Sequence, residues 1–282
     1  MTTSPSSSAQ TARAALAARL REIRLDAGLT KRELAARCGW HESKSSRIEN
    51  VRTPPSDADI QAWCRACDAE RRAPDLIVAN READSLYVEW KRLQRTGLRR
   101  LQESGVPLYE STRRFRIYCS NVVPGVLQTP GYAQALLSSI AAFRGTPDDV
   151  ADAVTARMAR SRAVREGDHR LAILVEETVL RYRLGDAGVM AGQLGHLLSA
   201  MDLPSVSLGI IPSTVPRRMW PLETFTVFDD HRVHLEPLSA SIKIISPEEI
   251  ALYVRAFDEL RGLAAYGAEA RALVVRAIDA LG

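Results

Sequence analysis

The spacing of hydrophobic and polar residues predicts a helical N-terminal part, followed by a part in which strands and helices alternate. Apolar residues recur at helical spacing over residues 11–26 and again over residues 57–67. A long amphipathic stretch from Asp75 to about Glu103 predicts a helical connector. The apolar positions behind these predictions are Leu16, Leu20, Ile23, Ile60, Trp63, Leu86, Trp90, Leu93, Leu98 and Leu101.

Beyond residue 111 the apolar runs become short. Residues 112–118, HRLAILVEETVL, SVSLGIIP and SIKIIS predict strands, and ETFTVFDD and RVHLEPL alternate about a turn, which predicts a β-hairpin. A capping residue followed by proline marks helix starts at Thr129-Pro130 and Ser246-Pro247. Strands that alternate with helices in this way predict a mixed sheet with helices packed on it.

Residues 28–50, GLTKRELAARCGWHESKSSRIEN, predict two short helices joined by a tight turn. Thr30 and Glu33 have the spacing of a capping box at the start of the first helix. Gly39 can adopt the left-handed conformation that ends a helix, and the second helix then runs to Asn50. A turn of about three residues that contains glycine, between two such helices, is typical of a helix-turn-helix.

The second of these helices carries few apolar residues, and Ile48 is its one strong apolar anchor. A helix that is polar over most of its surface is weakly stabilised by its own sequence. Its composition makes sense if one face enters a DNA major groove, where base edges require donors and acceptors. The alternative is a solvated helix in a small helical bundle.

We expect this helix to contact DNA bases and its flanks to contact phosphates. The predicted base-contacting residues are Glu42, Ser43, Lys44 and Arg47, with Arg47 on guanine and Glu42 on a cytosine amino group. The predicted phosphate-contacting residues are Lys31, Arg32 and Arg52. Because one helix reads only a few base pairs, we expect a homodimer on a pseudo-palindromic site in double-stranded DNA.

With its lead-in LREIRLDAGLT and its close SRIEN, this region resembles the helix-turn-helix domain of the phage-repressor (Xre) type. The resemblance covers about fifty residues and implies a transcriptional regulator. Two positions depart from the pattern: Ser45 stands where that family usually has an apolar residue, and Val51 where it usually has glycine. We expect looser packing of the second helix and an altered exit turn.

The C-terminal part resembles actinobacterial regulators with a DUF5753 domain, described as antitoxin-like. The segments that carry the resemblance are VPGVLQTPGYAQALL, ARMARSRAV, LVEETVLRYRLGD, MAGQLGHLL and SVSLGIIP, in this order. The resemblance implies that this part binds a small, toxin-like partner protein. The alternatives are a small-molecule effector bound by the C-terminal domain, and an enzyme fused to a DNA-targeting module. MWPLETFTVF departs from the glycine-rich approach to the hairpin that the resemblance implies.

The predicted fold class is therefore multidomain: an all-α N-terminal helix-turn-helix bundle, then a mixed α/β (α+β) domain with helices on a small mixed sheet. The predicted divisions are a disordered arm (1–11), the helix-turn-helix domain (12–73), a helical connector (74–104) and a DUF5753-like domain (105–282).

Charge separates the two halves of the chain. Residues 1–100 hold 19 Lys and Arg against 13 Asp and Glu, whereas the whole chain of 282 residues has a net charge of only +4. This asymmetry favours a polyanionic partner for the N-terminal part. No apolar run is long enough to cross a bilayer, and MTTSPSSSAQT lacks the apolar segment of a signal peptide. We therefore expect a cytoplasmic, nucleoid-associated protein without membrane contact.

Cysteine spacing raises the question of a metal site. Cys38-x2-His41 followed by Cys64-x2-Cys67 resembles zinc-ligand spacing. However, Cys38 falls at a core position, and Cys64 and Cys67 lie on an amphipathic helix, so buried thiols explain them, as they explain Cys119. We expect no metal and no cofactor.

No catalytic motif stands out in the sequence, which contains no G-x-S-x-G, no phosphate-binding G-x-x-x-x-G-K-[ST] and no H-E-x-x-H. His231 and His234 would face opposite sides of a regular hairpin strand, as would Glu176 and Glu177. We therefore expect that the protein is not an enzyme. A run of arginines favours a helix C-terminus through the helix dipole: Arg157, Arg160, Arg162 and Arg165.

Overall fold

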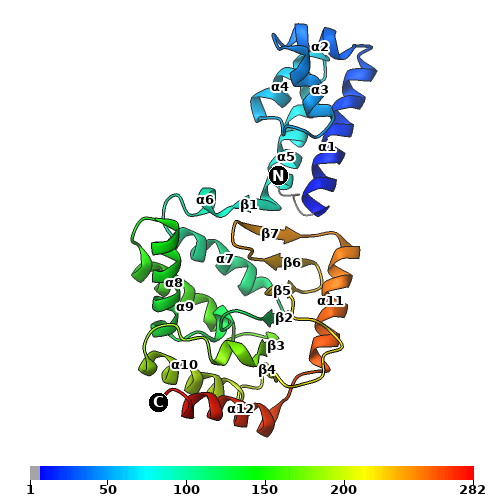
Figure 1. The fold of residues 1–282 in the computed structure, drawn as a ribbon. Coiled ribbons are helices and arrows are strands. Elements are labelled where there is room, and N and C mark those ends of the chain that lie inside the picture. Colours follow the sequence, from blue (N-terminus) through cyan, green and yellow to red (C-terminus); the bar gives the residue numbers. More distant parts are fainter. Residues whose placement is uncertain (1–6, 165) are drawn as a thin grey trace. The chain divides into compact units, whose positions relative to one another are not determined.

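A computed structural model describes residues 7–164 and 166–282, which form two compact units (Figure 1). The first unit is Met1–Val88 with Ile242–Ile244, and the second is Glu89–Ser241 with Ile245–Gly282. The first is helical and contains the helix-turn-helix, and the second combines a mixed sheet with helices, so the predicted fold class is confirmed. None of the described helices is long and apolar enough to span a membrane.

Five α-helices build the first unit around one apolar core. Trp63 lies in this core, and its indole nitrogen donates to the carbonyl oxygen of Leu20 at 3.0 Å. Apolar side chains from all five helices meet there, including Leu34 of the predicted first short helix and Ile48 of the second. The helices are α1 (Ser7–Asp26), α2 (Lys31–Arg37), α3 (Glu42–Glu49), α4 (Asp57–Ala66) and α5 (Ala73–Ser85), with a 3-10 turn η1 (Glu70–Arg72).

The predicted disordered arm is wrong for residues 7–11, which form the first turns of α1. Ala9 is fully buried there, so the helix gains packing that the polar sequence does not indicate. Residues 1–6 of the predicted arm lie outside the described residues, as does Arg165.

The predicted helical stretch from Asp75 to about Glu103 is not continuous. After α5 come a short strand, a helical turn and a separate helix: β1 (Tyr87–Glu89), α6 (Trp90–Leu93) and α7 (Arg99–Ser111). The carboxylate of Asp149 causes the new start, because it accepts from the backbone nitrogens of Leu98 (2.7 Å) and Arg99 (2.9 Å). A cap supplied from this far along the chain leaves no local sequence signal.

A mixed sheet forms the centre of the second unit, with strand order β7-β6-β5-β2-β3-β4. β2, β3 and β4 run parallel, whereas β5 is antiparallel to both β2 and β6. The predicted hairpin is confirmed at β5 and β6, where Asp229 and Asp230 take the positive φ angles (48° and 59°) of a tight turn. The strands are β2 (Arg114–Cys119), β3 (Arg170–Glu176), β4 (Val206–Ile211), β5 (Phe225–Phe228), β6 (Arg232–Leu235) and β7 (Ala240–Ile244).

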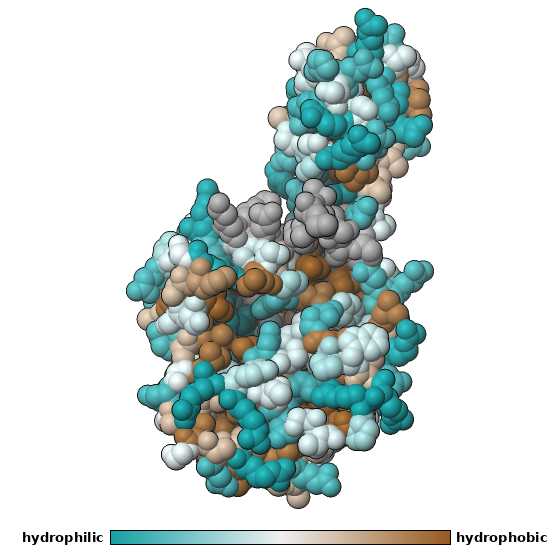
Figure 2. Space-filling model, in the orientation of Figure 1, coloured by the Kyte–Doolittle hydropathy of each residue, from teal (hydrophilic) through white to brown (hydrophobic). Residues whose placement is uncertain are grey.

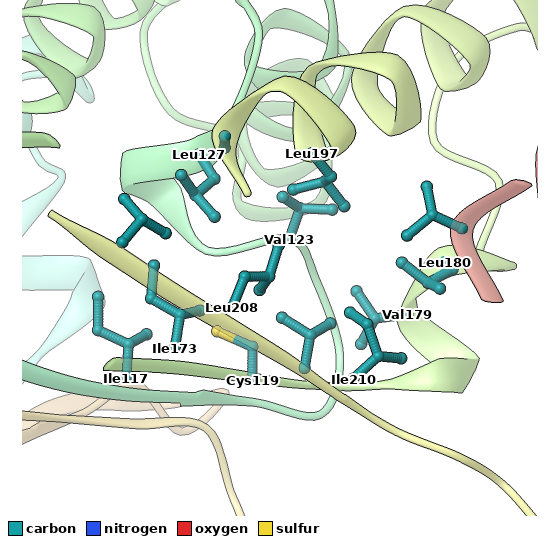
Figure 3. Packing of buried hydrophobic residues seen from close by; sticks show 14 of the residues in the cluster. Ile117, Cys119, Val123, Leu127, Ile173, Val179, Leu180, Leu197, Leu208 and Ile210 are labelled. Atoms are coloured by element: carbon teal, nitrogen blue, oxygen red, sulfur yellow. The ribbon is translucent and has the colours of Figure 1, made fainter. Parts of the chain in front are cut away.

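Helices cover both faces of this sheet. Ile117 and Cys119 of β2 point towards α10, where Leu197 meets them in the main apolar cluster (Figure 3). Tyr118, between them in sequence, points to the other face and packs on Phe225, which in turn contacts Tyr253 of α11. The remaining helices are α8 (Pro130–Arg144), α9 (Val150–Arg160), α10 (Ala187–Ala200), α11 (Pro247–Arg261) and α12 (Gly267–Asp279), with 3-10 turns η2 (Gly125–Leu127), η3 (Ser161–Val164) and η4 (Glu177–Leu180).

Candidate nucleic-acid interface

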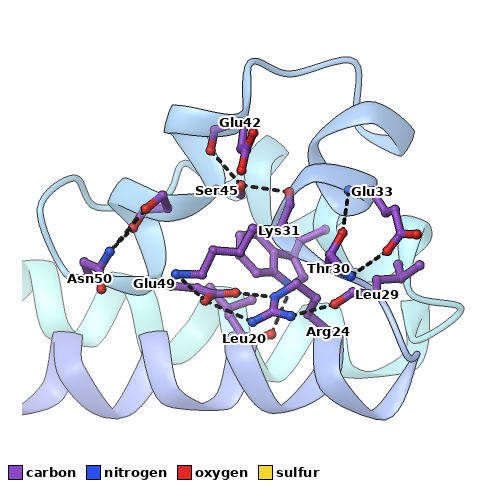
Figure 4. Close-up of polar contacts among 12 residues, drawn as sticks. Leu20, Arg24, Leu29, Thr30, Lys31, Glu33, Glu42, Ser45, Glu49 and Asn50 are labelled. Carbon is purple, nitrogen blue, oxygen red and sulfur yellow. Dashed lines mark hydrogen bonds and ion pairs between the residues drawn. The ribbon is translucent and has the colours of Figure 1, made fainter.

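The turn between α2 and α3 has the geometry that the sequence predicts. The Thr30 hydroxyl accepts from the backbone nitrogen of Glu33 (3.2 Å), and the Glu33 carboxylate accepts from the backbone nitrogen of Thr30 (2.7 Å; Figure 4). These bonds lower the pKa of Glu33. Gly39 has a φ of +68°, so it ends α2 in the left-handed conformation. His41 then caps α3, because its ring nitrogen Nδ1 accepts from the backbone nitrogen of Ser43.

Ser45 takes the position at which the resemblance implies an apolar residue, and it is completely buried. Its hydroxyl donates to the carbonyl oxygens of Glu42 (2.9 Å) and Lys31 (3.2 Å), which joins α3 to the first turn of α2 (Figure 4). A buried hydroxyl with partners of this kind carries little penalty. The expected loosening is therefore wrong: hydrogen bonds hold this position in place of apolar packing.

The inner side of α3 also carries a charge. Glu49, with 2% of its side chain exposed, accepts from Arg24 of α1 at 2.6 Å and lies 3.4 Å from the Lys31 ammonium nitrogen. Arg24 donates in addition to the Leu29 carbonyl oxygen at 2.6 Å. The carboxylate thus ties the end of α3 to α1 and to the start of α2. Lys31, predicted to contact phosphate, is held partly by this pair.

The outward face of α3 presents three of the four residues predicted to contact bases. Glu42, Ser43 and Arg47 are exposed, and the Arg47 guanidinium makes no hydrogen bond or ion pair within the described chain. Lys44 differs, since its ammonium nitrogen lies 2.5 Å from the Asp59 carboxylate and 4.3 Å from the centre of the Trp40 ring. Lys44 therefore points back towards α4, and a contact with a base would require it to leave Asp59.

Arg32 and Arg52, both predicted to contact phosphates, are exposed. Arg32 precedes α3 in the sequence and Arg52 follows it. Neither has a side-chain partner among the described residues. Val51, just before Arg52, has a φ of +57°, which is unusual for a β-branched residue. Val51 thus holds the left-handed conformation that glycine would favour.

The cysteines of the first unit lie close together in its core. Burial, reinforced by the neighbouring thiols of Cys38 and Cys64, raises the pKa of Cys67 to about 11. The Cys38 sulfur is 3.5 Å from the Ala62 carbonyl oxygen, while His41 caps α3. Within residues 7–164 and 166–282, no group of three or more His, Cys, Asp and Glu side chains is arranged to hold a metal ion.

In the second unit the two glutamates at the end of β3 have different partners. Glu176 accepts from the Tyr118 hydroxyl at 2.8 Å and pairs with Arg217. Glu177 accepts from both the backbone nitrogen and the hydroxyl of Ser213, each at 2.8 Å. These bonds fasten the loop after β4 to the end of the sheet. They give both carboxylates a structural explanation.

The run of arginines predicts a favourable helix dipole at the end of α9, but two of these side chains have specific partners. Arg157 and Arg160 turn inwards and meet at Gln102 of α7. Their spacing of three residues, which places both on one helix face, was the available signal.

Comparisons with known proteins agree with this division of the chain. The family described as "Helix-turn-helix domain" matches residues 15–75. A solved structure described as TrmBL2, an archaeal chromatin protein with a novel mode of DNA binding, is 12% identical, and the alignment covers 85% of this chain and 88% of that one. Its TM-score is 0.35, too low to support an inference about fold or function. No curated protein sequence matches the chain.

The second unit gives the longer match. The family described as "Domain of unknown function (DUF5753)" matches residues 107–276. That range takes in the sheet strands β2–β7, as well as α8–α11. Because the match spans more than half of the sequence, the protein belongs to the DUF5753 family.

Proposed function

We propose that the protein is a sequence-specific, DNA-binding transcriptional regulator of the phage-repressor (Xre) type that acts as a homodimer. The observation that carries the proposal is the division of α3 into two sides. Ser45, Ile48 and Glu49 fix the helix to α1 and α2, while Glu42, Ser43 and Arg47 extend from it without a role in the core. A short helix seated in this way can enter a major groove without disturbing the bundle.

The charges around α3 suit a polyanion. Arg32, Arg47 and Arg52 are exposed and have no acidic side-chain partner within the described residues, so all three are available to DNA. In this proposal Arg47 donates to a guanine, Glu42 accepts from a cytosine amino group and Ser43 contacts a neighbouring base edge. Arg32 and Arg52 contact phosphates, and Lys31 and Lys44 join them only when DNA competes with Glu49 and Asp59.

For the second unit we propose the role that the resemblance implies: an antitoxin-like regulator, from an actinobacterium, whose DUF5753 domain binds a small partner protein. This part rests on similarity alone. The protein carries out no catalysis in this proposal and works in the cytoplasm, on the nucleoid.

The proposal is tested by footprinting the full-length protein on the DNA upstream of its own gene. We expect a protected, pseudo-palindromic site with half-sites about one helical turn apart. Fluorescence anisotropy on that duplex and on a shuffled duplex of equal length, over a range of salt concentrations, separates specific from non-specific binding. Equal affinity for the two duplexes, or no salt-dependent binding, would contradict the proposal. Co-purification from native extract tests the partner protein independently.

A further inference from the structure

Two arginines on α9 converge on one amide oxygen in the second unit. Arg157 donates from Nε to the side-chain oxygen of Gln102 at 3.1 Å, and Arg160 donates from Nη2 to the same oxygen at 2.8 Å. Arg157 also donates from Nη1 to the side-chain oxygen of Gln128 at 2.7 Å. Because one atom accepts from both guanidiniums, two positive charges lie within a few ångströms of each other.

No carboxylate among the described residues forms an ion pair with these charges. Within the described chain neither Arg157 nor Arg160 forms a salt bridge, whereas the buried Arg24 and the partly buried Arg217 each pair with a glutamate. The amides of Gln102 and Gln128 accept hydrogen bonds but carry no charge. Burial, and then the charge of Arg160, lower the pKa of Arg157 to about 10.

One acid, Glu236, acts on Arg157 from a distance. Glu236 raises the pKa of Arg157, in opposition to burial, but it is exposed and makes no ion pair with either guanidinium among the described residues. A pair of arginines that served only to join α9 to α7 would be more stable with an acid between them. Arg157 and Arg160 therefore lack a compensating negative charge among the described residues.

Two glycines, Gly105 and Gly125, lie against the guanidinium of Arg160. A Cβ atom at Gly105 would lie 3.1 Å from its Nη1 atom, and one at Gly125 would lie 3.6 Å from its Nη2 atom. On another side the guanidinium packs over the Tyr109 ring, 5.1 Å from the ring centre. Figure 2 shows a hydrophilic hollow on the visible face of this unit, at the level at which Figure 1 places α7 and α9.

The two guanidiniums also have N–H groups that these hydrogen bonds do not use. Each carries five N–H groups, and the hydrogen bonds to Gln102 and Gln128 engage only a few of them. Planar guanidinium forks match the paired oxygens of a phosphate or carboxylate group, which would also supply the missing charge. We propose that Arg157 and Arg160 form a binding site in the second unit for a small ligand that carries a phosphate or carboxylate group.

This site is independent of the proposed DNA contacts and can be tested without DNA. The full-length protein is titrated with sodium phosphate and, separately, with sodium acetate, in isothermal calorimetry and in thermal melting. Sodium chloride at equal ionic strength is the reference. We expect saturable binding of at least one of the two oxyanions and a rise in melting temperature beyond that in chloride. Binding of phosphate alone or of acetate alone would identify the class of ligand. A rise in melting temperature in chloride equal to that in phosphate and in acetate would overturn the proposal.

Variants locate the site. Arg160→Gln keeps a hydrogen-bond donor but removes the charge, and we expect it to weaken oxyanion binding at least tenfold. Arg162→Gln is the matched control, because Arg162 lies two residues further on, is exposed and has no described side-chain partner. Its affinity should equal that of the unmodified protein. Binding that persists unchanged in Arg160→Gln, for example at the exposed arginines of the first unit, would overturn the proposal.

A second variant decides the matter if Arg160→Gln does not fold. Gly105→Ala places a methyl group beside Arg160 at a helical position where alanine is favoured over glycine. We expect its melting temperature without ligand to be unchanged or higher and its oxyanion affinity to fall. Unchanged affinity in a folded Gly105→Ala protein would overturn the proposal.

Discussion

Arg24 donates two hydrogen bonds to the carboxylate of Glu49, from Nε at 2.6 Å and from Nη2 at 3.2 Å, and both side chains are almost completely buried. The pair joins the last turn of α1 to the last turn of α3 (Figure 4). Ile48 anchors α3 by apolar packing, and the ion pair at Glu49 provides a second fixed point. Together they fix the orientation of the helix proposed to read DNA.

Removal of Glu49 should therefore destabilise the first unit. Glu49→Ala leaves Arg24 buried without its charge partner, and we expect a loss of about 3 kcal/mol in the free energy of unfolding. Urea unfolding followed by circular dichroism measures it. Arg81→Ala is the control, because it breaks the exposed pair with Asp57 and should cost less than about 1 kcal/mol. Equal losses in the two variants would show that the buried pair contributes no more to the free energy of unfolding than the exposed pair.

Replacement of Arg47 should affect specific binding and leave stability unchanged. The side chain is exposed and has no described partner, so Arg47→Ala should melt like the unmodified protein. We expect a loss of about 1–3 kcal/mol in binding to the cognate duplex and relaxed preference at one base pair. Anisotropy with a set of single-base operator variants measures both. The control is Arg21→Ala on α1, and equal weakening on cognate and shuffled DNA would exclude the base contact.

Arg52 and Lys31 should differ in their effect on salt dependence. Arg52 is exposed without a described partner, so Arg52→Ala should weaken binding to all duplexes alike and reduce the slope of log K against log salt by about one. Lys31 already lies 3.4 Å from Glu49, and its loss should reduce the slope by less. Titrations at four or more salt concentrations give the slopes. A larger reduction of the slope on loss of Lys31 than on loss of Arg52 would mean that Lys31 leaves Glu49 when DNA binds.

Val51→Gly should stabilise the first unit. Val51 holds a φ of +57°, a conformation that costs an L-residue roughly 1–2 kcal/mol, and its side chain is 37% exposed, so little packing is lost. The greater freedom of glycine in the unfolded chain offsets part of this gain. We expect a net gain of up to about 1 kcal/mol, measured by urea unfolding. A loss of stability would show that the turn depends on packing by Val51.

The pairing of Asp59 with Lys44 should make the first unit sensitive to acid. Burial alone would raise the pKa of Asp59, but hydrogen bonds from Lys44 and Ser56 outweigh it and hold the pKa below its ordinary value of 3.8. A pKa that is lower in the folded state gives stability above the unfolded-state value, which is lost as the pH falls through the folded-state value. Unfolding experiments at several pH values below about 5 should show this loss.

Asp59→Asn should lower stability at neutral pH and reduce the loss in acid, because the asparagine does not titrate. Glu82→Gln, at an exposed position of α5, is the control and should follow the unmodified protein. An unchanged acid profile in Asp59→Asn would assign the sensitivity to other carboxylates.

Local signals predicted the helix-turn-helix well. Thr30 and Gly39 each act within a few residues of their own position, and the structure confirms the cap at Thr30 and the turn at Gly39. The hairpin at Asp229 and Asp230 is local in the same sense. Periodicity and capping residues carry such information because the bonds they form span only one turn.

Features that depend on distant partners could not be predicted in this way. The amphipathic pattern between Asp75 and Glu103 continues past the point at which Asp149 starts a new helix. The charge on Lys44 suggests a free DNA-contacting side chain, but Asp59, fifteen residues away, binds it. Arg157 and Arg160 likewise acquire their role from Gln102, on a different helix. Composition gives the residue types in these cases, and only the tertiary structure gives their partners.

The two-sided construction of α3 has a consequence for how such a regulator can change during evolution. Anchoring falls to Ser45, Ile48 and Glu49, so substitutions at Glu42, Ser43 and Arg47 carry almost no folding penalty. A duplicated gene could therefore acquire a new operator through a handful of codon changes while its product remains stable throughout. The same separation makes those three codons suitable for a randomised library selected on altered promoters.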